Sequence, residues 1–158
     1  MVAIGEYAPD FALPNQNGQQ VKLSHFRGQK VIIFAFPKAG TGGCTAQACG
    51  FRDTFPQFQA QNAVILGLST DRPNELKRWH MAQKLQYDLL SDPKRAVIDE
   101  WNAGGKTLLG IVPLPTARRS YWVIDETGVI IDMKIDVGPQ ESVEKALKAL
   151  QGATRGAS

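Results

Sequence analysis

Apolar runs of strand length recur along the first half of the chain and mark the centre of a sheet. Residues 31–36 and 63–69 are almost continuously apolar, which predicts strands that are buried on both faces. Pro37 ends the first run, because proline has no N–H with which to join a strand ladder. Residues 87–90 predict a third, shorter strand.

Four segments are predicted to be helices. They are residues 45–61, 73–86, 94–101 and 142–150. Pro56 falls inside the first segment and is expected to break or kink it. Pro73 stands in the first turn of the second segment, where a proline is tolerated. The stretch at 151–158 is expected to fray.

Two pairs of short strands, each with a glycine-containing polar turn, complete the pattern. They are residues 11–13 with 20–23 and residues 120–125 with 129–135. Residues 104–116 carry two prolines and are predicted to be irregular. Alternating strands and helices imply parallel strands, and the late hairpin makes the sheet mixed. We therefore predict an α/β protein with a thioredoxin-like fold, in which helices flank both faces of a central mixed β-sheet and a β-hairpin precedes it.

Length and charge limit the classes of function. The chain has 158 residues, enough for one domain, which we expect at 1–151 with a flexible tail at 152–158. The net charge is +3 and both signs are scattered, so nothing predicts binding to nucleic acid. Residues 1–10 lack the pattern of a signal peptide, and no apolar run is long enough to cross a membrane. We expect a cytoplasmic protein.

The chain has two cysteines, Cys44 and Cys49, which are too few for a disulfide framework. In the cytosol such a pair is more often catalytic or redox-sensing, although a buried cysteine is commonly inert packing. Cys44 follows a strand and a Pro/Gly turn, so it is expected in the first turn of a helix. There, unpaired N–H groups and the helix dipole favour the thiolate, which is the nucleophilic form.

The spacing of the two cysteines predicts a conformational change. On an ideal helix, residues five apart have Cα atoms about 8.6 Å apart, whereas a disulfide needs less than about 7 Å. Cys44 and Cys49 therefore cannot bond while the helix is intact. We expect a folded thiol state and a locally unfolded disulfide state.

Ionisation alone does not make a fast catalyst. Full conversion to thiolate gains at most about thirtyfold in rate, because a free cysteine is already a few per cent ionised at pH 7. Nucleophilicity also falls as the pKa falls. Donors must therefore face the charge that develops on the substrate. The candidates are Thr41, the backbone N–H groups of Gly43 and Cys44, and an arginine. Gly42 and Gly43 leave the backbone uncovered there, so a small molecule can approach closely.

The residues around the cysteines resemble those of the peroxiredoxins, and most closely the Q subfamily, also called bacterioferritin comigratory protein. Pro37, Thr41 and Cys44 have the family's spacing. The resemblance covers roughly residues 5–135. It is carried by Phe36-Pro37-Lys38, Thr41, Cys44-Thr45, Ala48-Cys49-Gly50-Phe51-Arg52-Asp53, Ala8-Pro9-Asp10-Phe11, Leu68-Ser69-Thr70-Asp71, Leu89-Leu90-Ser91-Asp92-Pro93 and Arg119-Ser120-Tyr121-Trp122-Val123-Ile124-Asp125.

The resemblance implies a thiol-dependent peroxidase that reduces hydrogen peroxide and organic hydroperoxides. Cys44 corresponds to the peroxidatic cysteine, which becomes a sulfenic acid, and Cys49 to the resolving cysteine, which forms an intramolecular disulfide with it. Thioredoxin, or glutaredoxin, would recycle the disulfide. The resemblance also implies a monomer, and it implies neither a metal nor an organic cofactor.

The resemblance gives roles to further residues. Thr41 corresponds to the hydroxyl that contacts thiolate and peroxide, and Pro37 to the residue that shields the site from water. Arg119 corresponds to the arginine that holds the thiolate and polarises the O–O bond, because its neighbour Arg118 points to the opposite face of the strand. Gln47 stands where many relatives carry Glu or Gln and is expected to orient the arginine.

Two positions depart from the family, and two other functions stay open. Relatives commonly have Asp at Ala39 and Pro at Gly42, so we expect a looser turn before Cys44.

A thiol–disulfide oxidoreductase is one alternative function, although the usual Cys-x-x-Cys is missing. The other is a non-catalytic binding protein of thioredoxin fold, which would need neither Thr41 nor the arginine.

Overall fold

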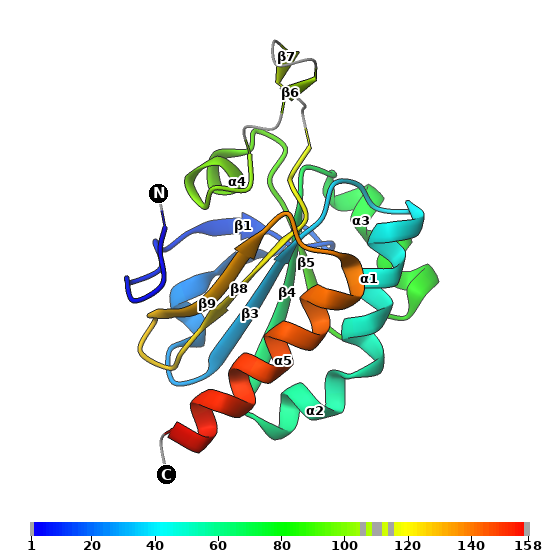
Figure 1. The fold of residues 1–158 in the computed structure, drawn as a ribbon. Helices are drawn as coiled ribbons and strands as arrows, with labels where there is room; N and C mark the ends of the chain where they lie inside the picture. The colour runs from blue at the N-terminus through cyan, green and yellow to red at the C-terminus, as the bar shows by residue number, and fades with distance from the viewer. Residues whose placement is uncertain (1, 105–106, 109–111, 114–115, 157–158) are drawn as a thin grey trace.

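The computed structural model describes residues 2–104, 107–108, 112–113 and 116–156. Its centre is a five-stranded sheet with the order β5-β4-β3-β8-β9 (Figure 1). The strands are β3 (Lys30–Ala35), β4 (Ala63–Ser69), β5 (Asp88–Ser91), β8 (Ser120–Ile124) and β9 (Ile130–Ile135). β3, β4 and β5 are parallel, whereas β8 and β9 are antiparallel to their neighbours. The sheet is mixed, as predicted.

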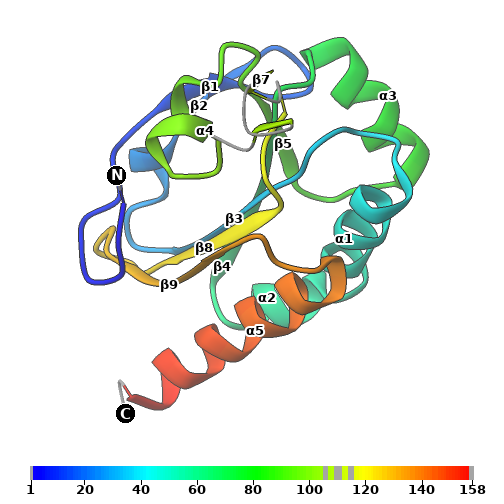
Figure 2. The same cartoon turned by 45° about the horizontal axis from the view of Figure 1, so that its top comes forward.

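Helices cover both faces of this sheet (Figure 2). One face carries α1 (Gly42–Asp53), α2 (Phe55–Ala60), α3 (Pro73–Gln83) and α5 (Pro139–Gly156). The other face carries α4 (Ala96–Glu100), a 3-10 turn at Leu23–Phe26 and the N-terminal hairpin of β1 (Ala12–Pro14) with β2 (Gln20–Lys22). The thioredoxin-like fold with an N-terminal hairpin is therefore confirmed.

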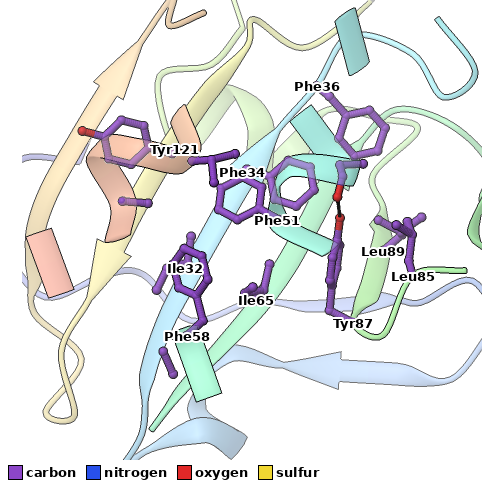
Figure 3. Packing of buried hydrophobic residues seen from close by; sticks show 14 of the residues in the cluster. Ile32, Phe34, Phe36, Phe51, Phe58, Ile65, Leu85, Tyr87, Leu89 and Tyr121 are labelled. Atoms are coloured by element: carbon purple, nitrogen blue, oxygen red, sulfur yellow. Dashed lines mark hydrogen bonds between the residues drawn. The ribbon is translucent and has the colours of Figure 1, made fainter. Parts of the chain in front are cut away.

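Strand β3 supplies both halves of the core, because successive side chains of a strand point to opposite faces. Ile32 and Phe34 belong to the cluster under α1 and α5, whereas Val31 and Ile33 belong to the cluster under α4 and the hairpin. The ring of Phe34 stacks on that of Phe51 in α1, with centroids 4.6 Å apart (Figure 3). This contact fixes α1 over the end of β3.

Several element boundaries differ from the predictions. The segment 45–61 is two helices, and Pro56 lies in the first turn of α2, where the break was expected. α1 starts earlier, at Gly42, because small residues there fit a first turn. α5 starts at Pro139, since proline suits a first turn, and its helical bonding continues to Gly156, past the predicted end at 150.

The segment predicted to be irregular, 104–116, contains two short strands. β6 (Thr107–Leu108) pairs antiparallel with β7 (Val112–Pro113), so the prediction is wrong for these residues. The remainder at 105–106, 109–111 and 114–115 lies outside the described residues. Among the helices of the described chain, none is both long and apolar enough to cross a membrane.

Candidate active site

The candidate site begins where β3 ends and the chain turns into α1. Gly40 takes a positive φ of 86°, which suits a glycine in this turn. The N–H of Ala39 donates to a carboxylate oxygen of Asp71, 2.8 Å away, and the hydroxyl of Ser69 donates to the same oxygen. These bonds join the turn to the end of β4. The turn is thus fixed through the backbone N–H of Ala39.

Cys44 lies in the first turn of α1 with its side chain fully buried, 0 % exposed. The first helical hydrogen bond is donated by the N–H of Thr45 to the carbonyl of Thr41. The N–H groups of Gly43 and Cys44 therefore precede the helical ladder and are directed out of the helix start. This is the arrangement that the sequence predicts, and it favours an anion at the sulfur.

Arg119 brings a full positive charge to the sulfur from the start of β8. Both terminal guanidinium nitrogens lie 3.6 Å from the Sγ of Cys44. Its neighbour Arg118 turns to the other side and pairs with Asp136. The two arginines directly precede β8, and Arg119, of the two, lies beside the cysteine, as expected. A two-nitrogen donor around one sulfur stabilises its anionic form.

Gln47 joins Arg119 to a second helix. Its side chain is fully buried, and its Oε1 accepts a hydrogen bond of 2.9 Å from Arg119. Its Nε2 donates to the Oγ of Ser142 in α5, 3.1 Å away. Sequence reasoning found Gln47 but missed Ser142, because no local signal shows that the start of α5 packs against α1.

Gly43 is the position of closest approach between α1 and Arg119. A Cβ built on Gly43 would lie 2.8 Å from a guanidinium nitrogen of Arg119, whereas one built on Gly42 has no atom within 4 Å. Gly43 therefore leaves room for the guanidinium. At Gly42 the extended backbone of Thr41 and the open surroundings would accommodate a proline.

The first prediction concerns this close approach. Gly43→Ala should slow the reaction of Cys44 with hydrogen peroxide by about three- to tenfold, because the new methyl group displaces a guanidinium nitrogen of Arg119 and weakens, without removing, its charge-assisted bond to the sulfur. Gly42→Ala is the matched control, since its methyl group meets open space. Stopped-flow fluorescence of both reduced variants measures the rates. Equal rates for Gly43→Ala and Gly42→Ala would contradict this explanation.

Thr41 and Pro37 lie at the open side of the site. The Thr41 hydroxyl donates to the carbonyl of Lys38, 2.9 Å away. Within the described residues, no hydrogen bond joins this hydroxyl to the Cys44 sulfur, although that contact was expected. Pro37 and Arg119 line a pocket of about 540 Å³ whose walls include Ala117. An open, partly apolar space thus adjoins the guanidinium.

Cys49 lies on the same helix as Cys44, and both are free thiols. The half-buried Cys49 thiol donates to the Oε1 of Gln83 in α3, 3.3 Å away. The hydroxyl of Tyr87 donates to the carbonyl of Ala48, 2.7 Å away (Figure 3). Burial raises the pKa of Tyr87, so its hydroxyl keeps the proton that it donates. In this structure α1 is intact and the two cysteines are not bonded to each other.

Other hollows of the described chain contain none of the candidate residues. One of about 410 Å³ lies at the opposite end of β4, where its lining includes Phe26, Gln59 and Asp88. Within the described residues, no three His, Cys, Asp or Glu side chains gather where they would hold a metal ion. The chemistry-bearing residues gather at the start of α1.

The site places a sulfur in the first turn of a helix and an arginine 3.6 Å from it, on a thioredoxin-like fold. This arrangement suits a thiol peroxidase, and comparison with known proteins gives the same class. Residues 4–133 match the AhpC/TSA family. Peroxiredoxin Bcp of Escherichia coli K12 is 42% identical over 126 residues, 80% of this chain and 81% of that protein. Peroxiredoxin bcp1 of Schizosaccharomyces pombe is 38% identical over 155 residues, 94% of this chain and 74% of that protein.

A solved structure gives the same result. The crystal structure of peroxidoxin BcpB from Mycobacterium tuberculosis superimposes with a TM-score of 0.86 at 31% identity, over 94% of this chain and 96% of that one. The chain therefore belongs to the AhpC/TSA family, as a peroxiredoxin of the Bcp and Q type. It is a thiol peroxidase, as the resemblance predicts.

Proposed function

We propose that Cys44 is the peroxidatic residue of this peroxiredoxin. The thiolate sulfur attacks one peroxide oxygen, so that an S–O bond forms while the O–O bond breaks. The leaving oxygen takes up the proton that the thiol released and departs as water or an alcohol. The sulfur is oxidised by two electrons to a sulfenic acid, and the peroxide is reduced. The observation that carries the proposal is the pair of 3.6 Å contacts from Arg119 to this sulfur.

Arg119 and Thr41 are proposed to bind the peroxide around the sulfur. Arg119 faces the negative charge that moves from sulfur to the leaving oxygen, and the N–H groups of Gly43 and Cys44 add further donors. The Thr41 hydroxyl already donates to Lys38, so its oxygen is an acceptor for the O–H of the peroxide. A donor at Arg119 and an acceptor at Thr41 thus bind different oxygens of a hydroperoxide and fix its orientation. Because Cys44 is buried, the peroxide enters beside the exposed Thr41.

Cys49 is proposed to resolve the sulfenic acid. Its thiolate attacks the Cys44 sulfur, forming an S–S bond while the S–O bond breaks. The leaving hydroxide takes up the proton that the Cys49 thiol released and departs as water. Helical spacing forbids this bond, so the start of α1 must unwind. Cys49 must also leave its hydrogen bond to Gln83. Phe51 is fully buried against Phe34, and a core phenylalanine contributes about 3–5 kcal/mol, so we expect unwinding to stop before it.

The finer features of the cycle are proposed as well. A dithiol protein such as thioredoxin, or else glutaredoxin, exchanges with the Cys44–Cys49 disulfide and becomes oxidised itself. A pair that must be reduced in each cycle fits the cytoplasm, where thiol reductants are maintained. We propose a monomer, because both cysteines of the cycle lie on one helix of one chain.

The substrates are proposed to be hydrogen peroxide and organic hydroperoxides. The pocket of about 540 Å³ beside Arg119 offers room for a substituent, and Pro37, Ala117 and Val137 give it apolar walls. A steady-state assay across hydrogen peroxide and several alkyl hydroperoxides, with thioredoxin and glutaredoxin compared as donors, tests this function. If the protein reduces none of these peroxides with either donor, the proposed function is overturned. A binding protein or a thiol–disulfide oxidoreductase then remains.

The second prediction tests the charge on the sulfur. Arg119→Ala should lower kcat/KM for hydrogen peroxide by about 10²- to 10³-fold, the usual effect of removing one donor to developing charge. Arg119→Lys should recover only part of this loss, because an ammonium lacks the two-nitrogen fork. Arg27→Ala is the control, since Arg27 donates to the carbonyl of Thr127 and lies outside the pocket beside Arg119. A loss in Arg27→Ala as large as that in Arg119→Ala would contradict the proposed site.

A further inference from the structure

A buried chain of hydrogen bonds runs from the start of α5 to the guanidinium of Arg119. The Ser142 hydroxyl donates to the carbonyl of Pro139, 2.7 Å away, and its Oγ accepts from the Nε2 of Gln47 at 3.1 Å. The Oε1 of Gln47 then accepts from Arg119 at 2.9 Å. Both Gln47 and Ser142 are 0 % exposed, so water does not replace these partners.

The proton count along this chain fixes the orientation of the Gln47 amide. A serine hydroxyl has one proton, and Ser142 gives it to the carbonyl of Pro139, which leaves the oxygen as an acceptor. The group that faces Ser142 must therefore be the NH₂ of Gln47. The carbonyl oxygen is then turned to Arg119, which has only donors. With the amide reversed, donors would face Arg119 and two acceptors would meet at Ser142.

Close packing holds Ser142 within reach of Gln47. A Cβ built on Gly50 of α1 would lie 2.9 Å from a methyl carbon of Val143, so α5 approaches α1 where α1 has no side chain. Val143, the next residue after Ser142, is buried in the same core cluster as Phe51. The contact between Gln47 and Ser142 is thus set by the packed interface of two helices.

We propose that Ser142 is a positioning residue for peroxide reduction. It orients the amide of Gln47, and Gln47 in turn holds the guanidinium of Arg119 on the Cys44 sulfur. The proposal rests on the proposed function of Cys44 and adds a residue of α5 that touches neither the sulfur nor the pocket beside it. Its effect is transmitted through the buried amide of Gln47 and the half-buried guanidinium of Arg119.

Ser142→Ala tests this role. The variant leaves a buried N–H of Gln47 without an acceptor. The amide then reorients, and Arg119 loses the hydrogen bond that keeps its guanidinium beside the Cys44 sulfur. The rate of reduced Cys44 with hydrogen peroxide should fall about tenfold, and the pH–rate profile for alkylation of Cys44 by iodoacetamide should move to higher pH. Ser142→Thr keeps the hydroxyl, which a helical threonine can also direct to the preceding turn, and should restore both.

A double-mutant cycle with Gln47→Met separates positioning from general loss of structure. Gln47→Met removes the same link from its other side, so it should show a similar rate loss, and Ser142→Ala should add no further loss to it. If Ser142→Ala does not fold, Gln47→Met alone carries the test, and a wild-type rate in that variant overturns the proposal. Independent, multiplying losses in the double variant overturn it too.

The controls distinguish this inference from the function on which it rests. A wild-type protein that consumes peroxide, with Ser142→Ala at the same rate and the same pH profile, overturns only the role of Ser142. Failure of Ser142→Thr to restore the rate does the same. A wild-type protein that consumes no peroxide at all overturns the proposed function instead.

Discussion

Replacing Cys44 by serine is expected to abolish peroxide reduction, with a loss of about four orders of magnitude or more in kcat/KM. A serine hydroxyl stays protonated at neutral pH, so the guanidinium of Arg119 faces no anion and no nucleophile is formed. Peroxide consumption coupled to thioredoxin and its reductase measures the effect. Circular dichroism should be unchanged, because the oxygen of serine fits within the space of the sulfur.

The same assay sorts the alternatives. A non-catalytic binding protein would consume no peroxide before or after the substitution. A thiol–disulfide oxidoreductase would reduce a disulfide substrate without peroxide, and Cys44→Ser would abolish that reaction. Peroxide reduction that survives in Cys44→Ser would contradict the assignment of Cys44, and Cys49 would then be the next sulfur to test.

Replacing Cys49 by serine is expected to separate the two half-reactions. The first turnover should proceed at the wild-type rate, because the Cys49 thiol faces Gln83 and not the candidate site. Recycling by thioredoxin should then stop after about one equivalent of peroxide per chain, a burst without turnover. Rapid-mixing measurements of peroxide consumed against time give both values. Undiminished cycling would show that the reductant acts directly on oxidised Cys44.

Much of the fold was predictable because its central strands are continuous apolar runs. β3 and β4 are buried on both faces, which local composition reports directly. The extent of α5 and the pairing of β6 with β7 were not predicted. Pro113 weakens the local signal for a strand, because proline cannot donate to a strand ladder. Pro139 is a local signal for the start of α5 that the prediction did not use.

The candidate site was predictable where its signals are local. The position of Cys44 follows from a strand, a turn and a helix start, and the choice of Arg119 over Arg118 follows from alternation along a strand. The hydroxyl directions of Thr41 and Ser142 were not predictable. Each depends on which carbonyl accepts the proton, Lys38 for Thr41 and Pro139 for Ser142, and only the folded chain fixes that choice.

The mass of the reduced protein after one equivalent of hydrogen peroxide tests the central claim most directly. The reaction is quenched with an alkylating reagent, which marks any thiol that survives. We predict a loss of about 2 Da and no alkylation, the product of a Cys44–Cys49 disulfide, with a peptide map that joins the two residues. A protein whose mass rises by two alkyl groups, one on each cysteine, would contradict the account.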